Sequence, residues 1–421
     1  MKALLVAYSY PPLQDAHAIR WYYLANALAD LGMEIDILTV SAPFHGEASW
    51  PLRPGVTVHR AFPGPVEHMA MRAKKGLNTD AEGNAGLRRK ASFRLLKSGY
   101  WAIRSLLNST LPGDIRTEWL PFAVPGAMKL AKTGRPDVLL TAHEPWVGCH
   151  AGLLLQKLLG VRWIADLGDP YVAPYTPRHK LAFERRIERA VYSRADALVF
   201  TTGSVVACLK ESYPFLASRT VRVIEQGFSM EEARRNTVTQ PSPTRVFTAA
   251  YTGTLYRGLR DPGPLAAALS QFSRPLKFVL AGRNEGFLED FKPLGESLKF
   301  TGFVDHHRAL EIQRSCDVLV HLSNSNSFQI PGKVYEYLGA RKPILCITGD
   351  GNDAAARLVR DTGCGLVCGN GAGQILEALE NIAGMRERGS TPPPPPLEKI
   401  MPYSWEEKAR SFFDLAAEIS R

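Results

Sequence analysis

Short apolar and β-branched runs alternate with longer stretches of helical periodicity along nearly the whole chain. In the first part of the sequence, the runs typical of strands are 3–8, 35–40, 56–61, 137–142, 162–167, 197–202 and 220–225. In the second part, they are 245–253, 277–282, 298–303, 317–323, 342–349 and 365–369. Helical patterns lie between most of these runs. This alternation predicts parallel strands joined by right-handed crossovers, which is an α/β architecture.

A polar, charged and proline-containing segment, residues 229–244, interrupts the alternation and is interpreted as a linker. We therefore expect an N-terminal Rossmann-like domain over 1–228 and a second one over 245–400. Residues 401–421 follow a proline run and predict a final helix, in which Ser404 and Glu407 resemble a capping box. Ligands of such parallel sheets bind at the carboxyl ends of the strands, so two facing domains would form a cleft for them.

The composition is that of an ordinary globular protein, with 421 residues of which 45% are hydrophobic. The six cysteines are scattered and no pair has the spacing of a zinc site, so we interpret them as reduced thiols. The apolar run at the N-terminus is too short for a signal peptide, and no apolar segment is long enough to span a bilayer. These features predict a cytoplasmic protein.

The net charge of +10 indicates an acidic partner, and basic residues gather between positions 71 and 107. Within this segment, residues 93–107 alternate apolar and basic positions at helical spacing and include Tyr100 and Trp101. One interpretation is a peripheral contact with an anionic membrane surface on the inner face, and the alternative is a solvated basic helix. No nucleic-acid-binding motif is visible, so nucleic acid is not expected as a partner.

The stretch QIPGKVYEYLGARKPIL, residues 329–345, follows a predicted strand and begins a predicted helix. Pro331 suits the first turn, and Gly332 lets a ligand approach the backbone. The free amides at the helix start attract a diphosphate, and Lys333 adds a full charge. Glu336 lies on the same face and suits two ribose hydroxyls. The alternative is a surface ion pair between Lys333 and Glu336.

This stretch resembles the nucleotide-binding signature of retaining glycosyltransferases of family 4, which have the GT-B fold, in the version found among cell-surface polysaccharide enzymes. The resemblance extends along the chain through YTGTLYRGL (251–259), LAGRN (280–284), FTGFVDHH (300–307) and CDVLVHLS (316–323). In the first domain it is carried by YSYPPLQDAHAIRW (8–21), WIADLGDPY (163–171) and VIEQGF (223–228). It implies two Rossmann-like domains facing across a cleft, with a C-terminal helix returning to the first.

The resemblance also implies roles for residues of the second domain. Arg257 and Lys333 would stabilise the departing diphosphate, aided by backbone amides near Gly253 and Gly332. The other donor-binding candidates are Thr254, Gly282, Arg283, Pro331 and Glu336. For Arg283 the alternatives are the edge of the base and solvent. Phe328 stands where many family members have a first glutamate. No metal or other cofactor is expected, because the sequence has no Asp-x-Asp triplet or histidine cluster.

Four residues are candidates on the acceptor side of the first domain. His143 follows a predicted strand and would orient the acceptor or the donor sugar, or be merely structural. Asp169, at the end of another strand, would face the acceptor or cap a helix. Arg20 would meet an acceptor phosphate or form a surface pair, and Asp166 belongs to the motif that resembles the family's acceptor-side segment.

The sequence therefore predicts transfer of a sugar from a nucleotide-diphosphate donor to a glycan or lipid-linked acceptor in cell-envelope or surface polysaccharide synthesis, with retention of configuration. A nucleotide-sugar 2-epimerase and a non-catalytic GT-B scaffold remain alternatives. A dehydrogenase fits least, because YSYPPL replaces the glycine-rich turn after the first strand.

Overall fold

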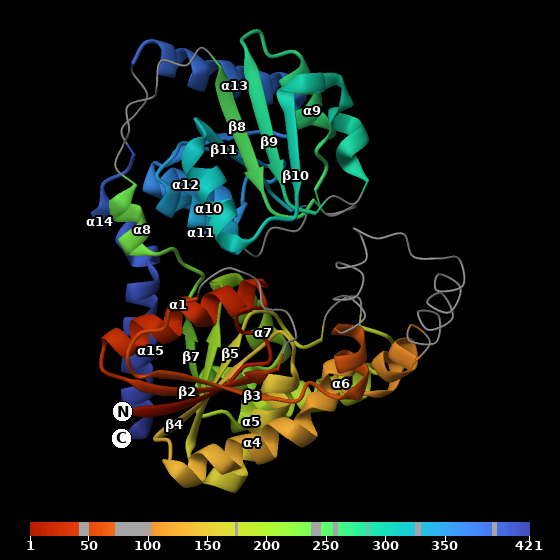
Figure 1. Ribbon diagram of the computed structural model, residues 1–421, viewed down its shortest axis with the longest axis vertical. Coiled ribbons are helices and arrows are strands. Elements are labelled where there is room, and N and C mark those ends of the chain that lie inside the picture. Colours follow the sequence, from red (N-terminus) through yellow and green to blue (C-terminus); the bar gives the residue numbers. More distant parts are fainter. Residues whose placement is uncertain are drawn as a thin grey trace, which may run out of the picture. The chain divides into compact units, whose positions relative to one another are not determined.

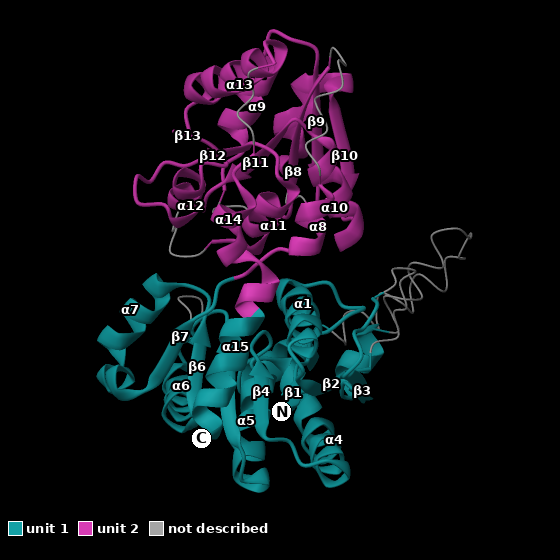
Figure 2. Ribbon diagram, turned by 90° about the vertical axis from the view of Figure 1, so that its left-hand side faces the viewer, with its two compact units in different colours: residues 1–225, 409–421 teal, residues 226–408 magenta. Residues whose placement is uncertain are grey.

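The computed structural model describes residues 1–41, 50–71, 101, 103–172, 176–236, 246–255, 260–283, 286–324, 330–389 and 394–421 (Figure 1). The chain divides into two compact units, shown in different colours in Figure 2. Unit 1 contains Met1–Glu225 and Ala409–Arg421, and unit 2 contains Gln226–Lys408.

Unit 1 is built on a parallel sheet of seven strands in the order β3-β2-β1-β4-β5-β6-β7. The strands are β1 (Lys2–Val6), β2 (Glu34–Val40), β3 (Val56–Ala61), β4 (Val138–Ala142), β5 (Arg162–Leu167), β6 (Ala197–Phe200) and β7 (Thr220–Val223). The principal helices are α1 (Ala16–Asp30), α4 (Leu120–Thr133), α5 (Val147–Leu159), α6 (Leu181–Arg194) and α7 (Gly203–Ser212). Each strand predicted for this part of the sequence is confirmed.

The sheet of unit 1 is covered on both faces, as expected for parallel strands. All five residues of β4 are buried. Alternate residues of the strands pack in one apolar cluster with α4, α5, α6 and α7. The helix α15 (Trp405–Ser420) contributes its later turns to this unit, where Phe412 lies 5.4 Å from Trp21 of α1 between ring centroids.

Unit 2 is built on a second parallel sheet of six strands in the order β10-β9-β8-β11-β12-β13. The strands are β8 (Phe247–Thr252), β9 (Leu276–Ala281), β10 (Leu298–Gly302), β11 (Val318–Leu322), β12 (Ile344–Ile347) and β13 (Gly365–Cys368). The helices are α8 (Met230–Arg235), α9 (Gly263–Ser270), α10 (His306–Ser315), α11 (Gly332–Ala340), α12 (Ala354–Thr362), α13 (Ala372–Glu387) and α14 (Leu397–Ile400). Two opposite apolar clusters, one with α11 and α12 and the other with α9 and α13, cover the sheet.

The strand order of each sheet reverses at one place, which marks where a ligand is expected. In unit 1 the reversal lies between β1 and β4, and in unit 2 it lies between β8 and β11. The crossovers leave in opposite directions on the two sides of such a point, so the loops separate beyond the carboxyl ends of the strands. The fold therefore predicts that ligand-binding residues follow β4 in unit 1 and follow β8 and β11 in unit 2.

The segment interpreted as a linker is partly helical. Its residues 230–235 form α8, which packs against α11, while 237–245 lie outside the described residues. The predicted final helix is α15, and the amide of Glu407 donates to Ser404 Oγ at 3.3 Å, as in one half of a capping box. In the described part of the chain, none of the helices has the length and apolar character needed to cross a bilayer.

Candidate active site

Helix α11 is held against the switch point of unit 2 by its buried face. Val334 and Leu338 point inward and are at most 1% exposed, as the sequence predicts. The hydroxyl of Tyr337 accepts a hydrogen bond from the Thr252 amide at 3.0 Å, which ties the helix to the end of β8. Gly332 is the first helical residue, and Pro331 precedes it as the cap. The amino end of α11 is thereby fixed beside the carboxyl ends of β8 and β11.

Two glycines at the ends of β8 and β9 leave room beside this helix start. Gly253 has φ +120°, and a Cβ there would lie 3.3 Å from Lys333 Cδ. Gly282 has φ +143°, and its Cβ would lie 2.0 Å from the carbonyl oxygen of Gly253. The positive φ favours glycine at both positions, and at Gly282 the space also excludes a side chain. The Lys333 side chain therefore extends over the end of β8.

The Lys333 amine is buried and has no anionic partner among the residues that the structure describes. Its Nζ lies 3.6 Å from the centre of the Tyr251 ring, is buried, and has no hydrogen-bond acceptor among the described residues. Burial, followed by the positive charge of Arg260, holds the pKa of Lys333 well below its ordinary value, while Glu336 acts in the opposite direction. The described side chains show no ion pair between Lys333 and Glu336, so the simple surface pair does not form.

A second cation that the sequence did not single out, Arg260, lies near Lys333. Its Nε donates to Asn324 Oδ1 at 2.7 Å, and its Nη1 donates to the Tyr251 hydroxyl at 3.0 Å and the Thr254 carbonyl at 2.7 Å. The predicted cation of this loop, Arg257, lies outside the described residues. Two arginines three positions apart are equally visible in the sequence, and only the loop conformation shows that Arg260 is turned inward.

The carboxylate of Glu336 is oriented by two side chains of α10. Its Oε2 accepts from Gln313 Nε2 at 3.0 Å, and its Oε1 lies 3.7 Å from His306 Nδ1. Gln313 is fully buried and also donates to Thr252 Oγ1 at 3.1 Å, so it links the carboxylate to the end of β8. The side chain of Glu336 is 22% exposed. Its carboxylate is therefore held in one orientation and still accessible.

Arg283 lies apart from these groups. Its side chain is exposed, and its guanidinium carbon is 5.3 Å from the centre of the Phe303 ring. Phe328, which occupies the place of the family's first glutamate, lies outside the described residues. Of the residues predicted for donor binding, the structure thus gathers Gly253, Thr254, Gly282, and the start of α11.

In unit 1, His143 follows β4 at the switch point. It is 2% exposed, and its Nδ1 accepts from the amides of Gly168 at 3.1 Å and Asp169 at 3.3 Å. Because Nδ1 is an acceptor, Nε2 carries the proton of the neutral ring and is a hydrogen-bond donor. Burial, followed by the neighbouring His17, holds the pKa of His143 well below its ordinary value, which keeps the ring neutral.

Gly168 is required by the packing of the His17 and His143 rings. A Cβ at Gly168 would lie 2.6 Å from His17 Nε2. The ligand atoms of His17, His143 and Glu144 lie within 4.8 Å of one another. This group is poorly suited to a metal ion, because the amides already hold the Nδ1 lone pair of His143 and Nε2 carries its proton.

Asp169 lies beside this histidine pair. Burial, together with the charge of Glu144 and a hydrogen bond with it, raises the pKa of Asp169 to about 6, against the opposing effect of His17. The predicted alternative, a helix cap, does not form, because among the described residues the next helix after Asp169 is α6, which begins at Leu181. The carboxyl group therefore titrates in the range where a small change in its surroundings changes its charge.

Arg20 and Asp166 have a different role from the predicted one. They form a buried bidentate ion pair, with Nε–Oδ2 and Nη2–Oδ1 distances of 2.9 and 3.0 Å. Arg20 also donates to the carbonyls of Ile224 and Glu225 at 2.8 and 2.7 Å. Arg20 is 0% exposed and Asp166 is 1% exposed, so neither a contact with an acceptor phosphate nor a surface pair is observed. This pair fastens α1 to the end of β5 and to the chain after β7.

Comparisons with known proteins agree with this geometry. A sequence profile of the glycosyl transferase 4-like domain matches residues 17–225. Residues 17–225 belong to the glycosyl transferase 4-like domain family, and the chain has the GT-B fold. Its first unit contains the glycosyl transferase 4-like domain, and the two parallel sheets are the two Rossmann-like domains of that fold.

Several solved structures share the fold over the full length. A sucrose-phosphate synthase from Thermosynechococcus elongatus superposes with a TM-score of 0.66 and 16% identity, covering 100% of this chain and 99% of that one. HepE from Anabaena, solved with UDP and glucose, gives 0.62 and 11% over 99% and 100% of the two chains. WaaG, a glycosyltransferase of lipopolysaccharide biosynthesis, gives 0.55 and 14% over 99% and 98%. No curated protein sequence matches the chain.

Three side chains of the candidate site were not singled out from the sequence. Arg260, Gln313 and His321 are each less than 10% exposed, and each lies beside α11 only through the fold. A buried glutamine on α10 and a histidine within a strand carry no local signal of chemistry. The sequence of β11 offers one signal of a functional residue, because His321 is the single polar residue in a strand that is otherwise apolar.

Proposed function

We propose that this protein is a glycosyltransferase, which transfers a sugar from a nucleoside-diphosphate donor to a glycan or lipid-linked acceptor, with retention of configuration, in the synthesis of a cell-envelope or surface polysaccharide. The observation that carries the proposal is the buried amine of Lys333, which has no hydrogen-bond acceptor among the described residues. It lies at the amino end of α11 and beside the switch point of unit 2. Such a place is suited to a diphosphate.

The charge of the departing diphosphate is the main electrostatic problem of sugar transfer. Lys333 and the free amides at the start of α11 supply positive potential for it. Arg260 adds a second positive charge nearby, and Arg257 of the same loop remains a proposed phosphate ligand. Glu336, held by Gln313, would accept hydrogen bonds from the two ribose hydroxyls. This arrangement supplies charge without a metal ion or another cofactor.

The acceptor side of the proposal lies in unit 1. The Nε2–H of His143 would donate to a hydroxyl of the donor sugar or the acceptor, and Asp169 would accept from the acceptor hydroxyl. In the retaining reaction, the bond between the anomeric carbon and the diphosphate breaks, and the acceptor oxygen bonds to that carbon on the same face. The acceptor's proton passes to the departing phosphate oxygen, so no side-chain nucleophile is needed.

The choice of donor begins with UDP-linked sugars. HepE from Anabaena shares the fold and was solved with UDP and with UDP-glucose. The base and sugar for this chain are best found with a panel of nucleotide sugars, measured by the rise in unfolding temperature. A donor present at about 100 times its Kd adds about 2.7 kcal/mol to the free energy of unfolding. Stabilisation by at least one nucleotide sugar supports the proposal, and the absence of any stabilisation contradicts it.

Incubation of the stabilising donor with and without acceptors then separates the alternatives. A 2-epimerase changes the donor sugar without any acceptor, a non-catalytic scaffold binds the donor without changing it, and a transferase forms a glycosylated acceptor. The structural neighbours include an epimerase of similar fold, from Listeria monocytogenes, with a TM-score of 0.54 and 12% identity. At that identity the likeness concerns the fold alone, so product analysis decides the matter.

A lipid-linked acceptor would place the enzyme at the inner face of a membrane. In the described part of the basic segment, Trp101, Ile103 and Leu106 are 55%, 50% and 63% exposed, and Arg104 stacks on Trp101 at 5.7 Å. Large apolar side chains next to basic ones are suited to an anionic lipid surface. The rest of the 71–107 segment lies mostly outside the described residues.

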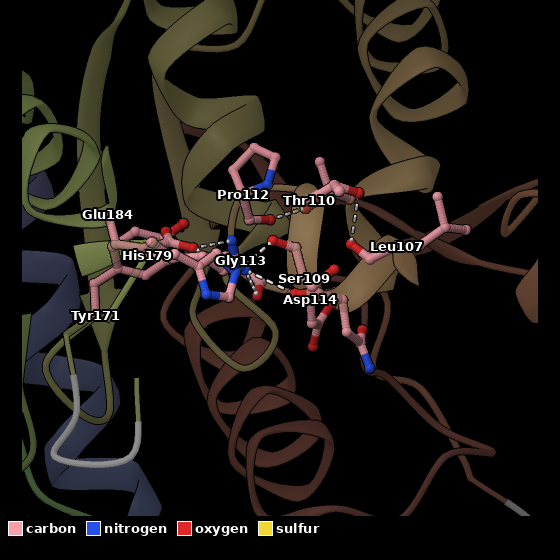
Figure 3. A network of polar contacts seen from close by, with 12 residues as sticks. Leu107, Ser109, Thr110, Pro112, Gly113, Asp114, Tyr171, His179 and Glu184 are labelled. Carbon is pink, nitrogen blue, oxygen red and sulfur yellow. Dashed lines mark hydrogen bonds and ion pairs between the residues drawn. The ribbon is translucent and has the colours of Figure 1, made fainter. Parts of the chain in front are cut away.

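The helical residues 103–110 are anchored to unit 1 by a network of polar contacts that includes α6 (Figure 3). Lys180 Nζ, which is buried, lies 3.0 Å from Glu184 Oε1 and donates to the carbonyls of Asn108 and Gly113 at 3.0 and 2.8 Å. The Gly113 amide also donates to Glu184 Oε1 at 2.9 Å. The exposed apolar side chains are thus presented from a fixed support.

A further inference from the structure

His321 is a buried titratable group to which the proposed reaction gives no role. It is 1% exposed, and neither ring nitrogen has a hydrogen-bond partner among the described residues. It lies two positions after Leu319 on the same strand, so the two side chains are on the same face of the sheet. Leu319 packs in the cluster that includes α11, and the ring of His321 therefore faces that side. An imidazole buried without partners is unfavourable, which suggests that its partner is present in another state of the site.

The Lys333 amine is in a similar situation. The groups that interact with it electrostatically are Arg260 and His321, Glu336 on its own helix, and Cys346 on β12. The ring of Tyr251 on β8 lies against it. The only one of these that is ordinarily an anion, Glu336, is engaged by Gln313 and forms no ion pair with Lys333. A desolvated ammonium beside another cation and without a paired anion is unfavourable, so the ligand-free site favours a neutral amine.

We propose that binding of the donor's diphosphate makes the Lys333 amine take up one proton from solvent, and that His321 is the buried acceptor that then orients the resulting ammonium. The proposal rests on the proposed donor site. The diphosphate supplies negative charge that the free site lacks, and the amine becomes an ammonium with three N–H donors. One would point to the phosphates and one to the lone pair of the neutral His321 ring. The low pKa of both groups in the free protein agrees with this sequence of events.

The coupling has a defined sign. The bound diphosphate raises the pKa of Lys333, so binding is strongest at pH values below the pKa of the free amine. Affinity then falls as the pH rises through the interval between the free and the bound pKa, because each binding event must withdraw a proton from an increasingly alkaline solution. A lysine that stays charged in both states would give no such dependence.

Calorimetric titration with UDP-glucose, ADP-glucose and GDP-mannose at pH 8 tests the coupling. These diphosphate diesters have no phosphate group that titrates near this pH. The binding enthalpy is measured in Tris and in HEPES, whose ionisation enthalpies differ, and the difference gives the number of protons taken up. We expect uptake approaching about one proton per donor bound.

Substitutions test whether Lys333 is the group that takes up the proton. In Lys333→Arg the side chain is charged in both states, so we expect no uptake. Lys299→Met, on an exposed lysine of β10, is the matched control and should keep the uptake of the unaltered protein. Uptake that persists in Lys333→Arg would overturn the assignment. Binding without any buffer dependence would overturn the coupling and leave the proposed function intact, whereas no binding of any of the three donors would remove both.

Two variants test the part of His321. His321→Leu removes the acceptor, and we expect the affinity for the donor to fall roughly ten- to a hundredfold. His321→Gln retains an acceptor and should recover most of that loss. Thermal unfolding of both variants without ligand reports on folding. Equal donor affinity of the leucine variant and the unaltered protein would overturn the role of His321.

Discussion

The amine of Lys333 lies 3.6 Å from the centre of the Tyr251 ring, and the hydroxyl of the same tyrosine accepts a hydrogen bond from Arg260 at 3.0 Å. One aromatic side chain at the end of β8 thus contacts both cations of the site. The face of the ring partly compensates the amine in the absence of an anion. The arrangement keeps two basic side chains close together beside the start of α11, where a diphosphate would bind.

The contact between Glu336 and the ribose can be isolated with a modified nucleotide. We expect Glu336→Ala to weaken binding of UDP roughly tenfold or more, because two hydrogen bonds to a charged group are lost. The loss should be much smaller for 2′-deoxy-UDP, since one of those hydroxyls is absent. Calorimetry of both nucleotides with both proteins forms a double cycle. Additive losses would show that Glu336 does not hold the ribose.

Gln313 orients the carboxylate of Glu336 and is not proposed to contact the nucleotide. A substitution of Gln313 is therefore a control for the double cycle. Gln313→Leu should reduce UDP affinity by less than Glu336→Ala does, while keeping the difference between UDP and the deoxy nucleotide.

The raised pKa of Asp169 predicts how activity depends on pH. If the ionised carboxylate accepts from the acceptor hydroxyl, kcat/KM should rise as the pH increases through about 6, and Asp169→Asn should be slow and lack this rise.

The contribution of Asp169 to the free energy of unfolding should change with pH in the opposite direction. A carboxyl whose pKa is raised by folding stabilises the folded protein at low pH, and that contribution is lost as the pH rises from the ordinary value toward about 6.

The asparagine variant should therefore be more stable than the unaltered protein at pH 7.5 and less active, as measured by chemical denaturation and by initial rates. A variant with unchanged activity at every pH would exclude Asp169 from the acceptor side.

Gly282 is expected to be intolerant of any side chain. Gly282→Ala places a Cβ 2.0 Å from the Gly253 carbonyl at φ +143°, so either the β9 turn or the β8 turn must move. We expect the free energy of unfolding to fall by roughly 1–3 kcal/mol, measured in urea. Gly373→Ala is the control, because nothing lies within 4 Å of its Cβ in helix α13, and alanine there should stabilise by up to about 1 kcal/mol. Equal effects of the two substitutions would contradict the packing argument.

Membrane binding can be tested on the exposed side chains. Replacement of Trp101, Ile103 and Leu106 together by serine should lower sedimentation with phosphatidylglycerol vesicles roughly tenfold or more, because half-exposed apolar surface is lost. The control replaces Leu154 and Leu158 of α5, which are 45% and 56% exposed, by serine. If both variants sediment like the unaltered protein, the surface is not a membrane contact.

The secondary structure of this chain follows closely from its sequence, and the reason is physical. Parallel strands in the middle of a sheet are buried on both faces, so such a strand appears as a continuous apolar run, as in Ala197–Phe200. The start of α11 was also predictable, because Pro331 and Gly332 follow the polar segment after such a run and precede an apolar helical pattern. Its inward face at Val334 and Leu338 follows from helical spacing.

Long-range pairing was beyond the sequence. Arg20 and Asp166 are 146 positions apart, and only the fold shows that they bind each other rather than a ligand. Arg260 could not be preferred to Arg257, because the direction of a loop side chain is not set by local pattern. The side-chain nitrogen atoms of Lys333 and His321 are buried and have no hydrogen-bond partner among the described residues. Only the packed structure shows this, so the sequence could not single them out as groups that a ligand would complete.

The most direct measurement is the affinity of UDP-glucose for Lys333→Ala by calorimetry, beside Lys299→Ala as a control on an exposed lysine of the same unit. We expect the first substitution to weaken binding roughly ten- to a hundredfold, because a charged contact to the diphosphate is lost, and the second to have no effect. Unchanged affinity in Lys333→Ala would contradict the assignment of the start of α11 as the donor site.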